Sequence, residues 1–322
     1  MTIRRLFARP LILVHFRHLS LTIHAVYDKL FLVDLDLPVS GFPQFIASWI
    51  LKDGDRALIV DPGPSVSVNI LLDSLRELGI NKIEHILLTH IHLDHAGGCG
   101  DLVRTYPDAE IVCHPRAVSH LADPERLWQG SLEVLGDLAR AYGKPSPIAE
   151  KRIRPDSDVV WNGSPVNSLE TPGHAVHHLC FFYRDLVFAG EAAGVSIPTG
   201  NNPYLRPATP PPFKPDIALH SISLVAERRP KIICYGHYGL RENATEMLHM
   251  AHDQIQFWLS VIKERQDKGL SMDEAEIFGE LLAKDPRLKA FYDLDAETRE
   301  RELYFCKNTI KGMAESLLGK PD

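Results

Sequence analysis

The chain has 322 residues, of which 45% are hydrophobic and 24% are charged. These proportions are typical of a folded globular protein and exclude a disordered chain, a collagen-like fibre and a coiled-coil rod. The net charge of −7 argues against a general nucleic-acid-binding protein. Five cysteines are scattered without a CxxC spacing, so the sequence predicts a reducing, cytoplasmic location with no disulfide framework and no thiolate zinc site.

Residues 1–27 are predicted to form a basic N-terminal arm. Residues 1–24 contain four arginines and no acidic residue. The apolar run at residues 10–14 is too short for the hydrophobic region of a signal peptide, and no A-x-A cleavage pattern follows it. No window of about 18 continuous apolar residues occurs, so we expect no membrane span and no membrane partner.

The main domain is predicted at residues 28–240, where short apolar runs alternate with turn residues. The runs are expected to form strands, because proline, glycine and aspartate bound them. Residues 66–79 instead place apolar side chains at helical spacing, which predicts an amphipathic helix. The expected strands are residues 30–35, 45–51, 57–60, 83–88, 110–113, 158–160, 166–169, 179–183 and 186–189, with a further strand at 232–235.

Two segments of the main domain depart from this pattern. Residues 115–143 have the apolar spacing of helices and are predicted to be a helical insertion. Residues 198–215 are rich in proline and are predicted to form a long loop. Two interpretations of this loop stay open, a functional loop beside the site and a connector stiffened by proline.

Residues 241–322 are predicted to be a C-terminal helical extension. They carry 12 basic and 17 acidic residues, so most of the excess negative charge lies here. Apolar residues follow a 3–4 spacing from 244 to 262, which predicts one long amphipathic helix, and residues 299–318 are expected to form another. The apolar face around Trp258 is interpreted either as packing onto the main domain or as the seam of a homodimer.

The densest group of metal-ligand side chains lies at the end of a predicted strand. Three histidines and one aspartate fall within six residues: His90, His92, Asp94 and His95. Imidazole and carboxylate are ligands that borderline divalent ions prefer. In an extended segment, residues two apart face the same way, so His90 and His92 are expected to bind one ion together. Once the chain turns helical, Asp94 and His95 point elsewhere and are expected to bind a second ion.

Three more candidate ligands follow predicted strands or turns further along the chain: His174, Glu191 and His237. Catalytic groups commonly occupy such loops on a rigid scaffold. Glu191 has two oxygens and is a candidate to bridge two cations. His177 and His178 follow the His174 turn and are expected to orient a ligand.

The order of these motifs resembles that of the metallo-β-lactamase superfamily: HxHxDH, then PGH, then a glycine followed by an acid, then GH. The resemblance covers residues 28–240, and the Asp61-Pro62-Gly63 turn fits the first core motif of the family. It implies an α/β fold, an αββα sandwich with a dinuclear metal site at one edge. The family normally has aspartate where this chain has Glu191, which keeps the charge and both oxygens but adds a methylene.

The resemblance also implies how the ligands are shared between two divalent ions. The first ion takes His90, His92 and His174, the second takes Asp94, His95 and His237, and Glu191 bridges them. Zinc is the expected metal, with iron or manganese as alternatives. Glutamate at the bridging position leaves open whether both sites fill, and we favour two ions.

Two cations that share a water lower its pKa and supply a metal-bridged hydroxide near neutral pH. This hydroxide is expected to attack a carbonyl or phosphoryl centre while the metals stabilise the developing oxyanion. Asp94 is predicted to be a ligand and also the catalytic proton acceptor. Tyr204, Arg206 and Tyr238 are candidate substrate contacts.

We interpret the chain as a metal-dependent hydrolase of a small ester, thioester or lactone, similar to the thioesterase, lactonase and glyoxalase II branch of the superfamily. A small-molecule substrate is expected and a nucleic-acid partner is not, because the chain is acidic. The first alternative is a mononuclear iron oxidoreductase that resembles sulfur dioxygenases. The second is a regulatory binding protein that retains its metals while the C-terminal extension covers the site.

Overall fold

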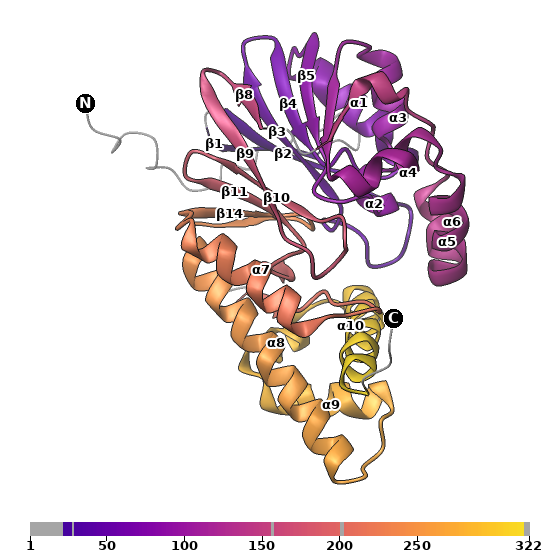
Figure 1. Ribbon diagram of the computed structural model, residues 1–322, viewed down its shortest axis with the longest axis vertical. Coiled ribbons are helices and arrows are strands. Elements are labelled where there is room, and N and C mark those ends of the chain that lie inside the picture. Colours follow the sequence, from indigo (N-terminus) through magenta and orange to yellow (C-terminus); the bar gives the residue numbers. More distant parts are fainter. Residues whose placement is uncertain (1–21, 28, 156–157, 200–202, 319–322) are drawn as a thin grey trace, which may run out of the picture. The chain divides into compact units, whose positions relative to one another are not determined.

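The computed structural model describes residues 22–27, 29–155, 158–199 and 203–318 (Figure 1). The chain forms two compact units, residues 1–168 (unit 1) and residues 169–322 (unit 2). The predicted basic arm lies outside the described residues as far as residue 21. Its last residues, Thr22–Tyr27, form strand β1, which pairs with β2, so the sheet begins ahead of the predicted boundary at residue 28.

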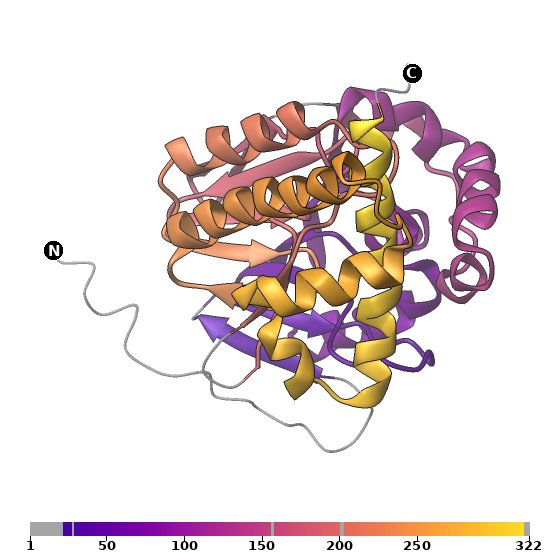
Figure 2. The same ribbon diagram turned by 90° about the horizontal axis from the view of Figure 1, so that it is seen from below.

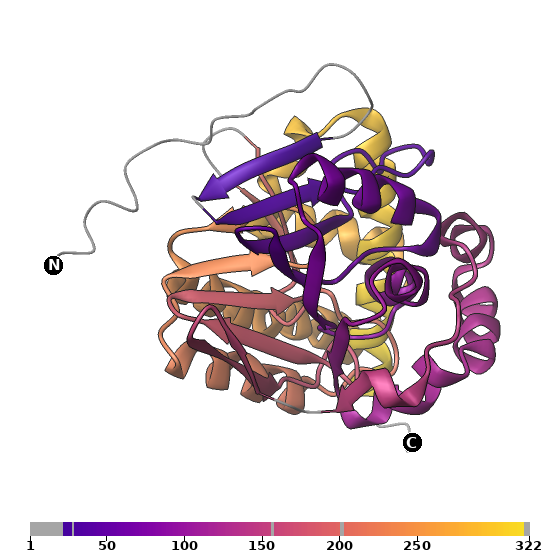
Figure 3. The same ribbon diagram turned by 90° about the horizontal axis from the view of Figure 1, so that it is seen from above.

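Unit 1 is built on a seven-stranded sheet whose strands lie in chain order. Strands β1 to β4 pair antiparallel, and β4 to β7 pair parallel. Strands buried on both faces carry continuous apolar runs, as the central strand β4 does in this chain. Figure 3 shows the strands from β1 to β6 in indigo to purple. Their bounds are β1 Thr22–Tyr27, β2 Leu30–Asp34, β3 Ala47–Asp53, β4 Arg56–Val60, β5 Lys82–Leu87, β6 Glu110–Cys113 and β7 Ile153–Pro155.

Helices connect the parallel strands of unit 1. The helix α1 follows β4 and buries its apolar stripe, as its predicted spacing requires. The segment predicted to be a helical insertion is helical, and it supplies α4, α5 and α6. The bounds are α1 Val68–Glu77, α2 Leu93–Ala96, α3 Cys99–Thr105, α4 Val118–Ala122, α5 Glu125–Leu135 and α6 Asp137–Tyr142.

Asp34 is a buried carboxyl group at the end of β2, and its side chain lies beside Asp36. Burial, reinforced by the negative charge of Asp36, raises the pKa of Asp34 from 3.8 to about 8. A raised pKa in the folded state means that the folded protein keeps a proton which the unfolded chain has lost. The free energy of unfolding therefore falls as the pH rises from about 4 to about 8. Above that range the whole free-energy cost of ionising the buried Asp34 is present.

Replacing Asp34 by asparagine should stabilise the protein by a few kcal/mol at pH 8 and change its stability little at pH 4, since one pKa unit corresponds to about 1.4 kcal/mol. The amide cannot ionise, so the pH-dependent cost disappears. Urea unfolding of both proteins at the two pH values measures the difference. Asp108→Asn, at an exposed turn position, is the control and should give the same small change at both values. An effect of Asp34→Asn that does not vary with pH would contradict the assignment.

The second sheet has the strand order β15-β14-β11-β10-β9-β8. The division between the units falls inside β9 (Ser164–Glu170), which pairs antiparallel with β8 (Val159–Trp161). In unit 2, β10 (Leu179–Tyr183) and β11 (Leu186–Gly190) form an antiparallel hairpin.

Strand β14 (Ile232–Tyr235) pairs parallel with β11, and β15 (Leu240–Arg241) pairs antiparallel with β14. Because β11 and β14 are parallel neighbours, their carboxyl ends meet at the same edge of the sheet. A separate two-stranded sheet joins β12 (Val195–Ile197) to β13 (Tyr204–Arg206). The proline-rich segment therefore contains a strand where the sequence predicts only loop.

The helices of unit 2 surround one hydrophobic core together with β10, β11 and β14 (Figure 2, orange to yellow). The long helix α8 confirms the prediction from residues 244–262, and α10 begins three residues earlier than predicted, where the side chain of Asp295 accepts the N–H groups of Glu297 and Thr298. The bounds are α7 Pro215–Glu227, α8 Ala244–Asp267, α9 Glu274–Lys284 and α10 Ala296–Leu317. Over the described ranges, no helix combines the length and the apolar character that a membrane crossing requires.

Trp258 lies wholly inside this core, and its indole N–H donates to the carboxylate of Asp285 at 2.8 Å. The face of α8 around Trp258 is therefore covered by side chains of unit 2 itself. The side chain of Trp258 is therefore not available to a homodimer seam, and a homodimer through other faces of the C-terminal helices stays a prediction.

Candidate metal centre

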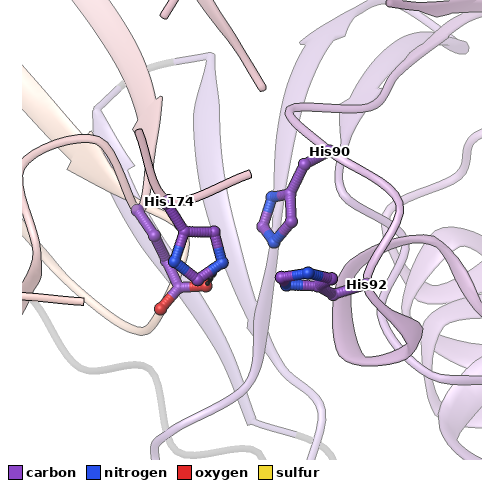
Figure 4. Close-up of side chains that lie close together, drawn as sticks. His90, His92 and His174 are labelled. Atoms are coloured by element: carbon purple, nitrogen blue, oxygen red, sulfur yellow. Dashed lines mark ion pairs between the residues drawn. The ribbon is translucent and has the colours of Figure 1, made fainter. Parts of the chain in front are cut away.

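The histidine-rich motif of unit 1 spans the loop after β5 and the short helix α2, which contains Asp94 and His95. The backbone is extended at His92, the N-cap residue of α2, and becomes helical immediately after it. The ring centroids of His90 and His92 are 4.6 Å apart in an edge-to-face arrangement (Figure 4), and those of His90 and His95 are 4.2 Å apart. Oδ2 of Asp94 lies 3.7 Å from Nε2 of His95. The four side chains therefore form one cluster within unit 1.

Asp61, in the turn after β4, orients this cluster through its carboxylate. Oδ1 accepts the backbone N–H of Thr89 at 2.8 Å, and Oδ2 accepts the Thr89 hydroxyl at 2.6 Å and Nδ1 of His95 at 3.1 Å. The turn is also tied to α2, since Gly63 N–H donates to the carbonyl of His95 and Gly98 N–H donates to the carbonyl of Gly63. A Cβ at position 98 would lie 3.2 Å from that same oxygen, so the close approach favours glycine.

These hydrogen bonds fix the protonated nitrogen of two histidines. A carboxylate only accepts, so His95 donates from Nδ1 to Asp61 and carries its lone pair on Nε2. Thr89 donates its hydroxyl proton to Asp61, so its oxygen accepts from Nδ1 of His90 at 3.1 Å. Both imidazoles are therefore held in a tautomer that can bind a metal through Nε2.

Replacing Asp61 by asparagine should weaken metal binding by about 10- to 100-fold, the range for groups that orient a ligand. Asparagine keeps the size of the side chain and tolerates the φ of +52° at this position, but it offers fewer acceptors to three donors. Competition with a coloured chelator measures the affinity, and circular dichroism checks the fold. Affinity equal to that of the wild type would show that Asp61 does not orient His95.

Unit 2 brings the other three predicted ligands together around one carboxylate. His174 lies in the turn after β9, Glu191 follows β11 and His237 follows β14. Nε2 of His174 (labelled in Figure 4) is 2.8 Å from Oε2 of Glu191, and Nε2 of His237 is 3.4 Å from Oε1. The carboxylate thus has one imidazole on each oxygen. The seven predicted ligands fall into two groups, one within each unit.

The hydrogen bonding of His174 requires a proton or a metal ion on its second ring nitrogen. Nδ1 lies 2.9 Å from the carbonyl oxygen of Ala208, which only accepts, so this nitrogen carries a proton. Nε2 faces a carboxylate oxygen of Glu191 at 2.8 Å, and a neutral ring would present its lone pair to that oxygen. Two acceptors at this distance repel each other unless a proton or a metal ion lies between them. Imidazole nitrogens and carboxylate oxygens together fit a divalent ion such as zinc.

Glu191 is buried and ionised. Burial alone disfavours its carboxylate, but the charges and hydrogen bonds of His174 and His237 outweigh burial and hold the pKa of Glu191 well below its usual range. Its backbone N–H donates to Nε2 of His178 at 3.1 Å, and Nδ1 of His178 therefore donates to the Thr171 hydroxyl at 2.8 Å. His178 thus fixes the backbone of Glu191 at the point where β11 ends.

Three groups that orient the candidate ligands were not predicted from the sequence: Thr89, Thr171 and the carbonyl of Ala208. Asp61 was predicted only as part of a turn. Each threonine lies within three residues of a candidate histidine, so proximity to the motif is a signal that could have singled it out. A backbone carbonyl has no such signal, because every residue supplies one.

Two of the predicted substrate contacts, Tyr204 and Arg206, are wrong. Both side chains lie inside unit 2, where they are 0% and 3% exposed. The Tyr204 hydroxyl lies 3.4 Å from Sγ of Cys306, and the Arg206 guanidinium pairs with the carboxylate of Glu302 in α10. These contacts hold β13 against α10. Tyr238 is half-buried and remains a candidate substrate contact.

Residues 41–237 match the family model of the metallo-beta-lactamase superfamily. The chain belongs to this superfamily. The matched range contains every candidate ligand from His90 to His237, so the membership confirms the resemblance that the order of the motifs indicates.

The curated relatives in the superfamily are distant. The metallo-beta-lactamase fold-containing protein ST1585 of Sulfurisphaera tokodaii is 26% identical over 232 residues, which cover 66% of this chain and 83% of that protein. A hydroxyacylglutathione hydrolase of Tolumonas auensis is 25% identical over 143 residues, 44% of this chain and 45% of the enzyme. An atrochrysone carboxyl ACP thioesterase of Passalora fulva is 30% identical over 140 residues, 43% of this chain and 33% of the enzyme. The match spans less than half the length of either enzyme.

Solved structures of superfamily members confirm the fold. The crystal structure of ST1585 from Sulfolobus tokodaii has a TM-score of 0.62 at 20% identity, covering 88% of this chain and 98% of that one. A metallo-beta-lactamase family protein from Thermus thermophilus has a TM-score of 0.61 at 19% identity, covering 90% of this chain and 93% of that one. The expected α/β metallo-beta-lactamase fold, with C-terminal helices added, is therefore correct.

Proposed function

We propose that the chain is a metal-dependent hydrolase that uses two divalent metal ions, with zinc as the expected metal. The observation that carries this proposal is the buried Glu191 carboxylate between the imidazoles of His174 and His237. A carboxylate with one imidazole on each oxygen is suited to bridge two cations. Members of the metallo-beta-lactamase superfamily are mostly metal-dependent hydrolases, which supports the assignment.

In this proposal the ligands are divided as the order of the superfamily motifs implies. The first ion takes His90, His92 and His174, and the second takes Asp94, His95 and His237. In this proposal Glu191 is shared between the two groups. All seven side chains are of types that zinc binds.

Bound divalent ions would supply a water of lowered pKa and a Lewis acid for a reacting carbonyl. The groups of the chain would hold this centre in place. Asp61 keeps His95 in the required tautomer, and His178 fixes the backbone of Glu191. Asp94, whose side chain is 13% exposed, is proposed as a ligand and as the proton acceptor.

A small ester, thioester or lactone is the proposed substrate. The names of two relatives, a hydroxyacylglutathione hydrolase and an acyl carrier protein thioesterase, make acyl thioesters the first compounds to test. The net charge of −7 argues against nucleic acid, because binding phosphates requires basic side chains.

Metal analysis followed by a substrate panel tests the proposal. Protein purified without added metal should contain about two divalent ions per chain and hydrolyse at least one acylglutathione, acyl-pantetheine or lactone. Removal of the metal by a chelator should abolish this activity, and added zinc should restore it. Protein that binds no metal, or that hydrolyses none of these compounds, would overturn the proposal. A single bound iron together with oxygen uptake on a thiol persulfide would instead support the oxidoreductase.

We also propose a cytoplasmic location. All five cysteines are free and buried. Burial raises the pKa of Cys113 and Cys180 to about 12, so neither forms a reactive thiolate near neutral pH. Free thiols are typical of reducing compartments. Fractionation of the source cells with an antibody against the chain tests the location.

A further inference from the structure

Helix α10 holds the segment that begins in β13 through three side-chain contacts. The carboxylate of Glu302 pairs with the guanidinium of Arg206. The hydroxyl of Thr309 donates to the carbonyl of Pro207 at 3.2 Å, and the hydroxyl of Thr209 donates to the carbonyl of Thr309 at 3.5 Å. The residues of each contact are about 100 positions apart in the sequence. The contacts therefore join the C-terminal extension to the segment that follows β13.

Gly312 brings the backbone of α10 against the same segment. A Cβ at this position would lie 2.1 Å from the carbonyl oxygen of Thr209 and 3.0 Å from backbone atoms of Pro210 and Pro211. Backbone atoms cannot rotate out of the way as the end of a side chain can, so any larger residue must displace the segment. Glycine is unfavourable inside a helix, and this close approach explains its presence here.

The segment held by α10 contacts two of the proposed metal ligands. The carbonyl of Ala208 accepts the Nδ1 proton of His174 at 2.9 Å. The carbonyl oxygen of Arg206 lies against Gly194, where a Cβ would come within 2.2 Å of it, and Gly194 N–H donates to the carbonyl of Glu191 at 3.0 Å. One segment therefore fixes the ring of His174 and packs against the turn that begins with Glu191.

The contacts between α10 and this segment are buried. Glu302 is 0% exposed, and Arg206, Thr209 and Thr309 are each at most 3% exposed. Burial disfavours the Glu302 carboxylate, but the guanidinium groups of Arg206 and Arg301 outweigh burial and lower its pKa, so the ion pair is maintained. Water cannot replace these contacts when one partner is removed.

We propose that α10 is a positioning element of the metal centre, in which Glu302, Thr309 and Gly312 hold the segment that orients His174 and the turn of Glu191. The effect of α10 on metal affinity rests on the proposed function. The effect on the His174 ring does not, because the hydrogen bond to Ala208 involves protein atoms alone. The C-terminal extension then contributes to the centre by fixing ligands.

Gly312→Ala tests the steric contact, and Gly279→Ala in α9 is the matched control. A Cβ at position 279 would meet nothing within 4 Å, so the same substitution there moves no neighbour. We expect Gly312→Ala to bind zinc about 10- to 100-fold more weakly than the wild type in chelator competition, and Gly279→Ala to stay within about twofold. A folded Gly312→Ala protein with wild-type zinc affinity would overturn the proposal.

Thr309→Val tests the polar contact with a side chain of the same shape, and Thr309→Ser should restore what valine removes. Long-range 1H–15N spectra of the metal-free protein report the protonated nitrogen of His174 directly. We expect an Nδ1–H signal in the wild type and in Thr309→Ser, and a shifted or exchange-broadened signal in Thr309→Val and Gly312→Ala. An unchanged signal in both variants would overturn the proposal. Wild-type protein that binds no zinc but shows the expected changes would overturn the proposed function and leave the positioning role supported.

Discussion

Replacing His92 by alanine should remove most of the bound metal and reduce kcat/KM by more than about 100-fold. Groups that only orient a ligand cost about 10- to 100-fold when they are changed, so loss of a ligand itself should cost more. The His92 imidazole lies edge to face with that of His90. In the His92→Ala variant this pair can offer the first metal ion only the His90 nitrogen. Elemental analysis of the purified variant and its rate on the best substrate measure the two effects.

The fold should survive this substitution, because the His92 side chain makes no capping hydrogen bond to α2 although the residue is its N-cap. Circular dichroism and the unfolding midpoint of the metal-free protein check this. His249→Ala, at an exposed position of α8, removes an imidazole away from the candidate ligands and should leave metal content and activity unchanged. Full activity in His92→Ala would refute the assignment of this loop as a metal site.

Replacing Glu191 by glutamine should lower the metal content from about two ions to about one and reduce kcat/KM by more than about 100-fold, equivalent to roughly 2.7 kcal/mol of transition-state stabilisation. Glutamine keeps the volume of the side chain but is uncharged, and its amide nitrogen would face one of the two imidazoles. It therefore has only one oxygen to offer. Metal analysis and steady-state kinetics measure the two effects on the same preparation.

Glu191→Asp separates charge from length at this position. Aspartate restores the residue that the superfamily normally carries, with both oxygens but one methylene fewer. We expect it to retain more metal and more activity than Glu191→Gln, because the negative charge is kept. Equal behaviour of the aspartate, glutamine and wild-type proteins would contradict a bridging role for the carboxylate.

Most of the fold was predictable from the pattern of apolar residues. The central strands appear as continuous apolar runs, and α1 and α8 follow helical spacing, because burial on two faces or on one stripe imposes those patterns. The strand β13 was not predictable, because it lies among prolines and, within the described part of the chain, pairs only with the three-residue strand β12. Strand β1 (Thr22–Tyr27) was not predicted either, because the basic residues before it suggested an N-terminal arm.

The sequence alone determined the candidate ligands and their order, since the residue types and their place after each strand carry the chemistry of a metal site. Only the tertiary structure decided which groups orient those ligands and which residues are buried. Tyr204 and Arg206 have side chains typical of substrate contacts, yet they pack against Cys306 and Glu302 from α10. The physical reason is distance along the chain. Local spacing fixes how neighbours face one another, whereas Arg206 and Glu302 are 96 positions apart and only folding brings them together.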